Sequence, residues 1–448
     1  MQEMTDKYRS LKLDMGQKIK VRDLLMQTCN PASFYLLPKV HKTFTKFPPG
    51  RPISSTCKSR NRNISAVVDF ILKPIMCTLP GSLLDTTHFL HILQNIELDV
   101  NKKYLLITCD IDSMYTNLNV NRCKYFCMKG FRKYKANNTL PFEINEQTMH
   151  SLLNISLDYN YLEYDNEFFV QHKSIQMGNC ASVSIANFTA YHELKKMFVN
   201  RPEIKLNVRF VDDGFMVVEC TTIENLDSWT KEVFKHEYLT FTVQSSPIEL
   251  NFLDVNVKIT NDNESQTSLY KKPMNKCMYL SFYSNHLLHS LPFSQGIRLK
   301  PICFETNECN EEIHKMLVNF EKRGYPKEIL EKCMYKLNNL KRYDLLKPKS
   351  EYLIHNLCIY YPEILLKYGI EISNRGMHMN IDNTKENHDF YVVVPFYNNV
   401  YRLRQIVKNF LNEEISQHTN PMIKHILQSM EIHVVFSVTN KLEFKLKM

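Results

Sequence analysis

Two adjacent aspartates, Asp212 and Asp213, lie between two short apolar segments, and this arrangement constrains the fold more than any other feature. Residues 207–210 and 215–219 have strand-like composition, and residues 211–214 predict a tight hairpin connection between them. Taken alone, an acidic pair at a turn also fits a solvated loop. The interpretation of this acidic pair therefore depends on which other acidic residues the fold brings to the same place.

A third apolar strand, residues 104–108, ends close to Asp110. If the three strands pair side by side, the carboxylates of Asp110, Asp212 and Asp213 converge within reach of Mg²⁺, a hard cation that prefers oxygen ligands. Two such ions about 4 Å apart can activate a primer 3′-hydroxyl and stabilise leaving pyrophosphate. Carboxylates packed so closely repel one another, so the pattern predicts a cation site of the phosphoryl-transfer type.

Composition permits this chemistry without demanding it. The chain has 448 residues with 44% hydrophobic content, enough for a substantial core, and Lys plus Arg exceed Asp plus Glu by 56 to 47. A basic excess of this size is compatible with binding a polyanion. The 13 cysteines form no CxxC pair, and no signal region or apolar run of about 18 residues is present. We expect free thiols in an intracellular, reducing compartment and no membrane span.

Pattern changes along the chain predict its organisation. From residue 35 to about 259, apolar strands alternate with helical stretches, which is typical of an α+β unit. Helices are expected to dominate from about 270 to 346, and residues 374–388 are polar enough for a loop. The last sixty residues have a strand, helix, strand pattern.

A basic hairpin is predicted near the N-terminus, with strands at 37–42 and 48–53 carrying Lys39, Lys42 and Arg51. Arginine offers a fixed fork to phosphate oxygens and lysine a mobile point charge, so these residues are candidate triphosphate ligands. A solvated basic loop is the alternative. The residues that follow add further cations suited to a phosphate backbone, namely Lys58, Arg60 and Arg62.

Three further segments could complete a nucleotide and primer site. Tyr115 follows Asp110 by five residues, so its ring could cover the sugar pocket and exclude a 2′-hydroxyl, although core packing explains an aromatic there equally simply. Gln176 and Gly178 precede a helix marked by apolar residues, where the glycine permits close backbone approach and could lie beneath a base pair or simply form a turn. Residues 251–255 and 267–273 are expected to form a pair of strands.

Residues 34 to about 345 resemble a reverse transcriptase, and their motifs are most similar to those of Penelope-like retroelements. The matching pieces occur in the family's order and are LPKVHK (37–42), PPGRPIS (48–54), TCDIDSMYTN (108–117), QMGNCAS (176–182), FVDDGF (210–215), FLDV (252–255), LYKKP (269–273), SNHLLHSLPFSQGIR (284–298) and FEKRGYP (320–326).

The resemblance implies an α+β right-hand polymerase fold with fingers, an antiparallel palm and a helical thumb. It implies an N-terminal helical remnant at 1–33, fingers and palm at 34–265, a thumb similar to a helix-turn-helix region at 266–345 and a connecting region at 346–448. The implied activity is RNA-directed DNA synthesis on an RNA template and DNA primer from dNTPs. Two Mg²⁺ ions, replaceable by Mn²⁺, would be held by Asp110, Asp212 and Asp213.

In family terms, Arg51 looks like a triphosphate ligand, Tyr115 like a steric gate, and Phe252, Leu253 and Asp254 like a primer grip, and Lys39 is expected to assist Arg51 by its charge. Helix cations of the thumb, Arg298 and Arg323, would contact the duplex backbone, although a solvated helix face is the alternative. Synthesis in the cytoplasm and action in the nucleus are expected, with no obligate protein partner.

Departures from the family motivate a second hypothesis. The family usually has Gly-Thr-Ala-Met-Gly and Ala-Pro where this chain has residues 174–178 and 182–183, and Asp112 replaces a small or hydroxyl residue. A GIY-YIG endonuclease, carried by many complete elements, is not expected in residues 389–445, which fits a truncated copy. The alternative is a decayed or co-opted remnant that binds nucleic acid without polymerising.

Overall fold

The computed structural model describes residues 30–39, 46–59, 61–77, 79–137, 144–220, 223, 225–273, 275, 277–284 and 290–346, together with the backbone of 390–395 and 432–437. The chain divides into two compact units. The first comprises Met1–Met274 with Leu346–Ser373, and the second comprises Asn275–Leu345 with Asn374–Met448. Each unit is described by itself.

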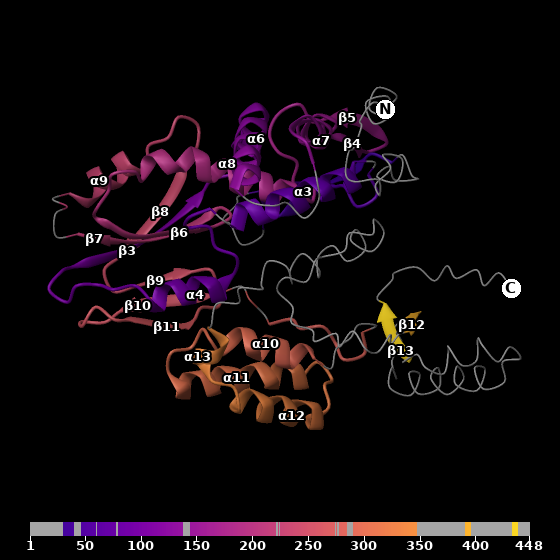
Figure 1. Ribbon diagram of the computed structural model, residues 1–448. Coiled ribbons are helices and arrows are strands. Elements are labelled where there is room, and N and C mark those ends of the chain that lie inside the picture. Colours follow the sequence, from indigo (N-terminus) through magenta and orange to yellow (C-terminus); the bar gives the residue numbers. More distant parts are fainter. Residues whose placement is uncertain are drawn as a thin grey trace, which may run out of the picture. The chain divides into compact units, whose positions relative to one another are not determined.

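The first unit is a mixed helical and sheet structure (Figure 1). Several of its helices begin at a side chain that caps a free backbone N–H, such as Asp85, whose Oδ1 accepts from His88 N at 2.8 Å. In chain order its elements are β1 (Ala32–Pro38), β2 (Gly50–Ser55), α3 (Arg62–Cys77), α4 (Thr86–Gln94), β3 (Tyr104–Ile111), α5 (Met114–Asn117), α6 (Val120–Asn137), α7 (Glu146–Asp158), β4 (Tyr161–Tyr164), β5 (Glu167–Val170), α8 (Ser182–Leu194), the 3₁₀ turn η1 (Lys195–Met197), β6 (Ile204–Phe210), β7 (Asp213–Glu219), α9 (Leu226–Val233), β8 (Phe241–Ser246), β9 (Glu249–Phe252), β10 (Val255–Ile259) and β11 (Ser265–Leu269).

A four-stranded antiparallel sheet, in the order β6-β7-β3-β8, forms the centre of this unit. Along the chain β3 leads into helices, β6 and β7 form a hairpin, and α9 connects to β8. With the short β4–β5 excursion set aside, this is the β-α-β-β-α-β succession of a split β-α-β sheet. The predicted α+β class and the antiparallel sheet expected for the palm are therefore confirmed.

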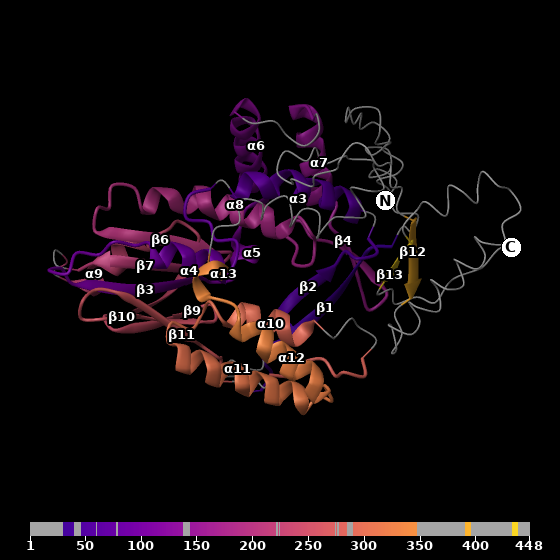
Figure 2. The ribbon, with the colours of Figure 1, turned by 60° about the horizontal axis from the view of Figure 1, so that its bottom comes forward.

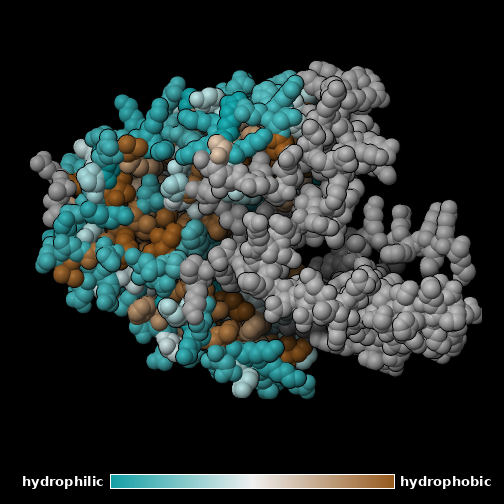
Figure 3. Space-filling model, in the orientation of Figure 1, coloured by the Kyte–Doolittle hydropathy of each residue, from teal (hydrophilic) through white to brown (hydrophobic). Residues whose placement is uncertain are grey.

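Both faces of the central sheet are covered. On one face, alternate residues of β3 and β7 pack against α9, with Ile107, Met216 and Trp229 among the buried members. On the other face, Phe215 of β7 meets Phe89 of α4 at 5.0 Å and Phe252 of β9 at 5.3 Å between ring centroids. Where Figure 1 places this sheet and β9, hydrophobic residues gather on the face shown in Figure 3, with hydrophilic residues around them.

A second four-stranded sheet, in the order β2-β1-β4-β5, includes the basic hairpin (Figure 2). Strands β1 and β2 pair antiparallel from Ser33–Ser55 to Pro38–Gly50, and β1 pairs parallel with β4. The antiparallel pair was predicted, but its first strand was wrongly placed at 37–42, because the pairing with β2 ends at Pro38. Helices α3, α6, α7 and α8 pack together through one continuous apolar cluster. Within this cluster, Ile64, Val68 and Ile71 of α3 are completely buried.

Other predicted strand boundaries were also wrong. The hairpin turn contains only Val211 and Asp212, because Asp213 pairs with both Phe210 and Asp110 and therefore lies inside β7. The span expected as one strand at 251–255 is broken by a tight turn at Leu253 and Asp254 between β9 and β10. At Asp213, the sheet pairs a residue with poor strand propensity. At Leu253, the chain turns at a residue that is not a usual turn former.

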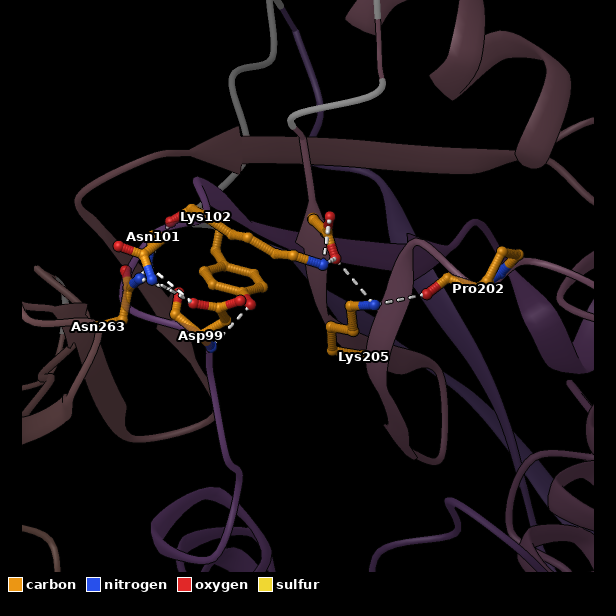
Figure 4. A network of polar contacts seen from close by, with 8 residues as sticks. Asp99, Asn101, Lys102, Pro202, Lys205 and Asn263 are labelled. Carbon is orange, nitrogen blue, oxygen red and sulfur yellow. Dashed lines mark hydrogen bonds and ion pairs between the residues drawn. The ribbon is translucent and has the colours of Figure 1, made fainter.

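A polar network fastens the end of the central sheet away from Asp110 (Figure 4). Glu219 of β7 accepts from Lys102 Nζ at 3.1 Å and forms an ion pair with Lys205 of β6 at 2.9 Å. Asn263, in the turn between β10 and β11, donates to the carbonyl oxygens of Asp99 and Lys102 at 2.7 and 3.0 Å. The β9-β10-β11 sheet is thereby tied to the loop that precedes β3.

The second unit contains four helices among the described residues, α10 (Leu291–Leu299), α11 (Thr306–Glu321), α12 (Lys327–Asn338) and α13 (Arg342–Leu345). Gly296 of α10 lies against Leu337 of α12, where an added Cβ would meet the leucine side chain at 2.3 Å. Strands β12 (Phe390–Pro395) and β13 (Ile432–Ser437) pair in parallel. Within the described part of the chain, no helix has the length and apolar character needed to cross a membrane.

Asp69, in α3, is a buried carboxylate that makes stability depend on pH. It accepts a hydrogen bond from Ser184 Oγ of α8, yet burial raises its pKa to about 6, opposed by that hydrogen bond and by Lys73. Because the folded-state pKa exceeds the unfolded value, the native state holds the proton more tightly. This group therefore contributes stability at low pH that is lost as the pH rises from about 4 to about 6.

Asp69→Asn is expected to remove that pH dependence and to be more stable than the parent protein at pH 7, by about 1–3 kcal/mol. The amide still accepts from Ser184 but carries no charge to bury. Urea unfolding between pH 4.5 and 7.5 measures the difference, with the exposed Asp227→Asn as the matched control. Identical pH profiles for the two variants would contradict this assignment.

Candidate active site

The three predicted carboxylates lie at one corner of the central sheet. Asp110 of β3 stands directly opposite Asp213 of β7, so their side chains leave the same face, and cross-strand partners of this kind have Cβ atoms roughly 5 Å apart. Asp212 occupies the hairpin tip, and its carbonyl oxygen accepts from Ile111 N at 3.1 Å. Antiparallel pairing thus brings together residues that are about a hundred positions apart in the chain.

The tip of the hairpin is conformationally strained. Val211 has a φ of 56°, a left-handed value that a β-branched residue rarely adopts. Only the first of the two turn residues has positive φ, as in a type II′ turn, where glycine is the usual occupant. Strain of this kind persists only where surrounding contacts enforce it, and it is concentrated at functional sites.

Arg209, which the sequence reasoning missed, supplies the enforcing contacts. Its Nη1 donates to Asn187 Oδ1 at 2.6 Å and to the carbonyl oxygen of Val211, and its Nη2 donates to Asn187 O at 2.8 Å. Burial lowers the pKa of Arg209 to about 10, opposed by its interactions with the Cys109 sulfur and the Asp212 carboxylate. The signal in the sequence was a single arginine in an otherwise apolar strand end, next to the acidic pair.

Mutual repulsion among the carboxylates is visible at Asp213. Burial, followed by the charges of Asp212 and Asp110, raises its pKa to about 6, while Lys272 acts in the opposite direction. In the described residues, no three Asp, Glu, His or Cys side chains already form a ligand set for one ion. The three carboxylates nevertheless fit Mg²⁺ chemically, because this hard cation prefers oxygen ligands. Its positive charge would also offset the repulsion between the carboxylates.

The segment after β3 contains Asp112 and Tyr115, whose surroundings could not be predicted from the sequence. Asp112 Oδ1 accepts from Thr242 Oγ1 of β8 at 3.0 Å, so this extra carboxylate is held by the neighbouring strand. Tyr115, in α5, is partly buried, and burial followed by the charge of Asp212 raises its pKa to about 12. The ring of Tyr115 therefore lies within the field of the acidic corner.

The loop at Gln176 and Gly178 connects this corner to the basic hairpin. Ile175 N donates to Tyr115 O at 3.0 Å, and Ser54 N of β2 donates to Met177 O at 2.7 Å. Gly178 has a φ of 114°, and an added Cβ would lie 2.4 Å from Ser54 O, so both its conformation and its close approach require glycine. The Gln176 side chain is 1% exposed, and neither its amide oxygen nor its amide nitrogen has a protein partner.

The basic residues predicted for phosphate contact have different surroundings. Arg51 is exposed on β2, and Lys39, partly buried, donates its backbone N–H to Pro49 O at 2.7 Å. Lys58 is exposed, and Arg62 Nη1 donates to Cys57 O at 3.2 Å and so closes the loop before α3. Lys42 and Arg60 lie outside the described residues.

The segment predicted as a primer grip forms the turn between β9 and β10. Phe252 is 3% exposed and packs on Phe89 and Phe215, so its ring belongs to the core. Leu253 has a φ of 56°, and Asp254 Oδ1 accepts from Thr86 Oγ1 at 2.6 Å. In this segment the hairpin tip, formed by the last two residues, is the part that reaches the surface.

In the second unit, the two predicted duplex-contacting arginines differ. Arg298 is exposed on α10. Arg323 follows α11 and is partly buried, with its Nε donating to Tyr279 O at 2.7 Å. Its guanidinium therefore has a structural contact within this unit as well as any role at the surface.

No family model and no curated protein matches this chain. Among solved structures, it is similar to a telomerase from Candida albicans in complex with a fragment of telomeric RNA, with a TM-score of 0.45 and 10% identity over 96% of this chain and 68% of that one. It is also similar to a truncated apo telomerase from Candida tropicalis, with a TM-score of 0.38 and 14% identity over 59% of both chains.

A viral RNA-dependent RNA polymerase, that of BmCPV, is similar with a TM-score of 0.37 and 10% identity. The match covers 64% of this chain but only 26% of the viral polymerase. At these identities and scores the likeness assigns no activity to this chain. An activity must be inferred from the geometry of Asp110, Asp212 and Asp213.

Proposed function

We propose that this chain is an RNA-directed DNA polymerase with fingers, palm and thumb, of the kind found in Penelope-like retroelements. One observation carries the proposal: Asp110 lies opposite Asp213 across two paired strands, with Asp212 at the adjoining strained hairpin tip. Three carboxylates at one corner of a split β-α-β sheet suit two-metal phosphoryl transfer. The motif order in residues 34–345 agrees with this reading.

In the proposed reaction the chain binds and orients a dNTP and a primer on an RNA template. Asp110, Asp212 and Asp213 would hold Mg²⁺, or Mn²⁺ in its place, which when bound favours the ionised 3′-hydroxyl and neutralises charge on the triphosphate. Arg51 and Lys39 would hold the triphosphate oxygens. Tyr115 would occupy the space of a ribose 2′-hydroxyl, and the turn at Leu253 and Asp254 would contact the primer.

Primer extension on an RNA template tests this proposal directly. The purified chain should add dNTPs to an annealed DNA primer when Mg²⁺ or Mn²⁺ is supplied, and the products should follow the template sequence. Binding of the primed template without any extension, in either metal, would instead support the remnant that only binds nucleic acid.

Tyr115→Ala is expected to raise incorporation of ribonucleotides relative to deoxyribonucleotides by about 10- to 100-fold, because the ring that would exclude the 2′-hydroxyl is removed. Tyr115→Phe keeps the ring and should keep the selectivity. Single-nucleotide incorporation with matched rNTP and dNTP pairs measures the ratio. Unchanged selectivity in the alanine variant would assign Tyr115 to core packing alone.

A further inference from the structure

A large pocket lies on the helix side of the central sheet, away from the carboxylates. It has a volume of about 1040 Å³ and is lined by α6, the end of α8, η1 and the residues after α9. Asp110 and Asp213 instead share the face of Phe215, which packs on α4 and β9. The pocket is thus separate from the candidate active site.

The lining of this pocket is strongly basic. Six of its residues are lysine or arginine and two are glutamate. Lys129 and Lys133 are one helical turn apart on α6, so their charges lie on the same face of the helix. One of the glutamates, Glu193, is already committed to Arg122, at 2.5 and 2.6 Å.

His192 gives an independent sign that the pocket lacks a partner. Its Nε2 is buried and has no hydrogen-bond partner in the protein. Burial, followed by the charges of Lys129, Lys195 and Lys133, lowers its pKa to about 4, so the ring is neutral and the charges of several lysines reach it. A buried polar atom without a hydrogen-bond partner is costly unless a ligand or water satisfies it.

Aromatic rings line the same pocket. Phe126 stacks on His192 with ring centroids 5.1 Å apart and planes inclined by 3°. Beside them Tyr125, which is 59% exposed, presents its ring to solvent with its centroid 5.3 Å from that of Phe126. On the face shown in Figure 3, the surface over α6 is hydrophilic, as its lysines require. Cations beside an accessible ring are what single-stranded nucleic acid binds, through phosphate contacts and base stacking.

We propose that this pocket binds an unpaired nucleic-acid segment, with phosphates on Lys129, Lys133 and Lys195 and a base stacked on Tyr125. The site is distinct from the carboxylate corner, so an inactive polymerase would still have it. The unpaired part of a template RNA would then bind this pocket, while the part of the template that is paired with the primer lies at Asp110, Asp212 and Asp213.

A fluorescent single-stranded RNA of about ten nucleotides is the probe, since sites of this kind cover about 4–16 nucleotides. Anisotropy at several salt concentrations measures its Kd on the full chain, with excess unlabelled blunt-ended RNA–DNA duplex, which has no unpaired template, present to fill the candidate active site. The K129Q/K195Q variant removes two pocket cations. Its matched control, K103Q/K231Q, removes two exposed lysines outside the pocket lining.

The pocket variant is expected to bind the probe at least about 10-fold more weakly near 0.1 M salt, with the slope of log Kd against log salt reduced by about 1.4. The control should shift both values far less. Equal losses in the two variants, or complete displacement of the probe from the parent protein by duplex, would overturn the proposal. Neither readout requires DNA synthesis, so failure here is distinct from failure of the polymerase proposal.

Stacking is tested separately with 2-aminopurine in the probe. Its fluorescence should be quenched by the parent protein and by Tyr125→Phe, which keeps the ring, but not by Tyr125→Ala. Quenching that persists in the alanine variant would exclude Tyr125 as the stacking surface and overturn that part of the proposal.

Discussion

Replacing Asp212 with asparagine is expected to lower the rate of primer extension by about 100- to 1,000-fold while leaving the protein folded. Removing one group that stabilises developing charge costs about 3–4 kcal/mol in comparable sites, and a neutral amide binds Mg²⁺ poorly. Folding should not suffer, because the Asp212 charge raises the pKa of Asp213 and its loss relieves repulsion. Single-turnover extension and thermal unfolding measure the two effects.

Asp112→Asn is the matched control for this experiment. Asp112 lies two residues after Asp110, but its carboxylate accepts from Thr242 of β8, and an amide oxygen can accept the same hydrogen bond. We expect extension within about 5-fold of the parent rate. A D212N variant that extends as fast as the parent protein would remove the central support for the proposed reaction.

Replacing Arg209 with methionine is expected to lower the free energy of unfolding by about 3 kcal/mol. The substitution keeps apolar bulk but removes the hydrogen bonds that Arg209 donates to the Val211 carbonyl and to Asn187 Oδ1, whereas Asn187 O keeps its donor within α8. The strained turn at Val211 should then relax, and Asp212 would move with it. We therefore expect extension to fall by more than the loss of folded protein explains, which urea unfolding and extension under stabilising conditions together determine.

Arg132→Met provides the comparison. Arg132 forms a surface ion pair with Glu146 at 2.6 Å, and exposed pairs of this kind contribute less than about 1 kcal/mol. The control should change neither stability nor extension appreciably. If both arginine variants behave alike, Arg209 has no special role in holding the hairpin tip.

The strands around the acidic pair were predictable because apolar, β-branched runs bounded by polar residues have a period that only a half-buried or buried strand satisfies. The residues at which these strands begin and end were not predictable in this way. Asp213 and Gly214 have low strand propensity, yet both pair with β3, since the neighbouring strand offers its hydrogen bonds up to Asp110. At Leu253 the chain turns with positive φ at a residue that no turn pattern favours.

Contacts between distant segments decided the remaining features. Alternation in β6 places Arg209 on the same side as Lys205 and suggests exposure, but α8 and the hairpin tip enclose its guanidinium. The basic pocket likewise combines Lys129 and Lys195, which are far apart in the chain and come together only because α6 packs on α8. Gly130 allows that packing, since an added Cβ would overlap the ring of Phe188.

By itself, the sequence predicted the α+β class, the strands on either side of the acidic pair and the candidate carboxylates, because hydrophobic period and residue chemistry are local properties. Only the tertiary structure decided that Asp110 faces Asp213, that Arg209 supports a strained turn, and that scattered lysines line one pocket. These depend on strand register and helix packing, in which the free energy comes from contacts between residues remote in the chain.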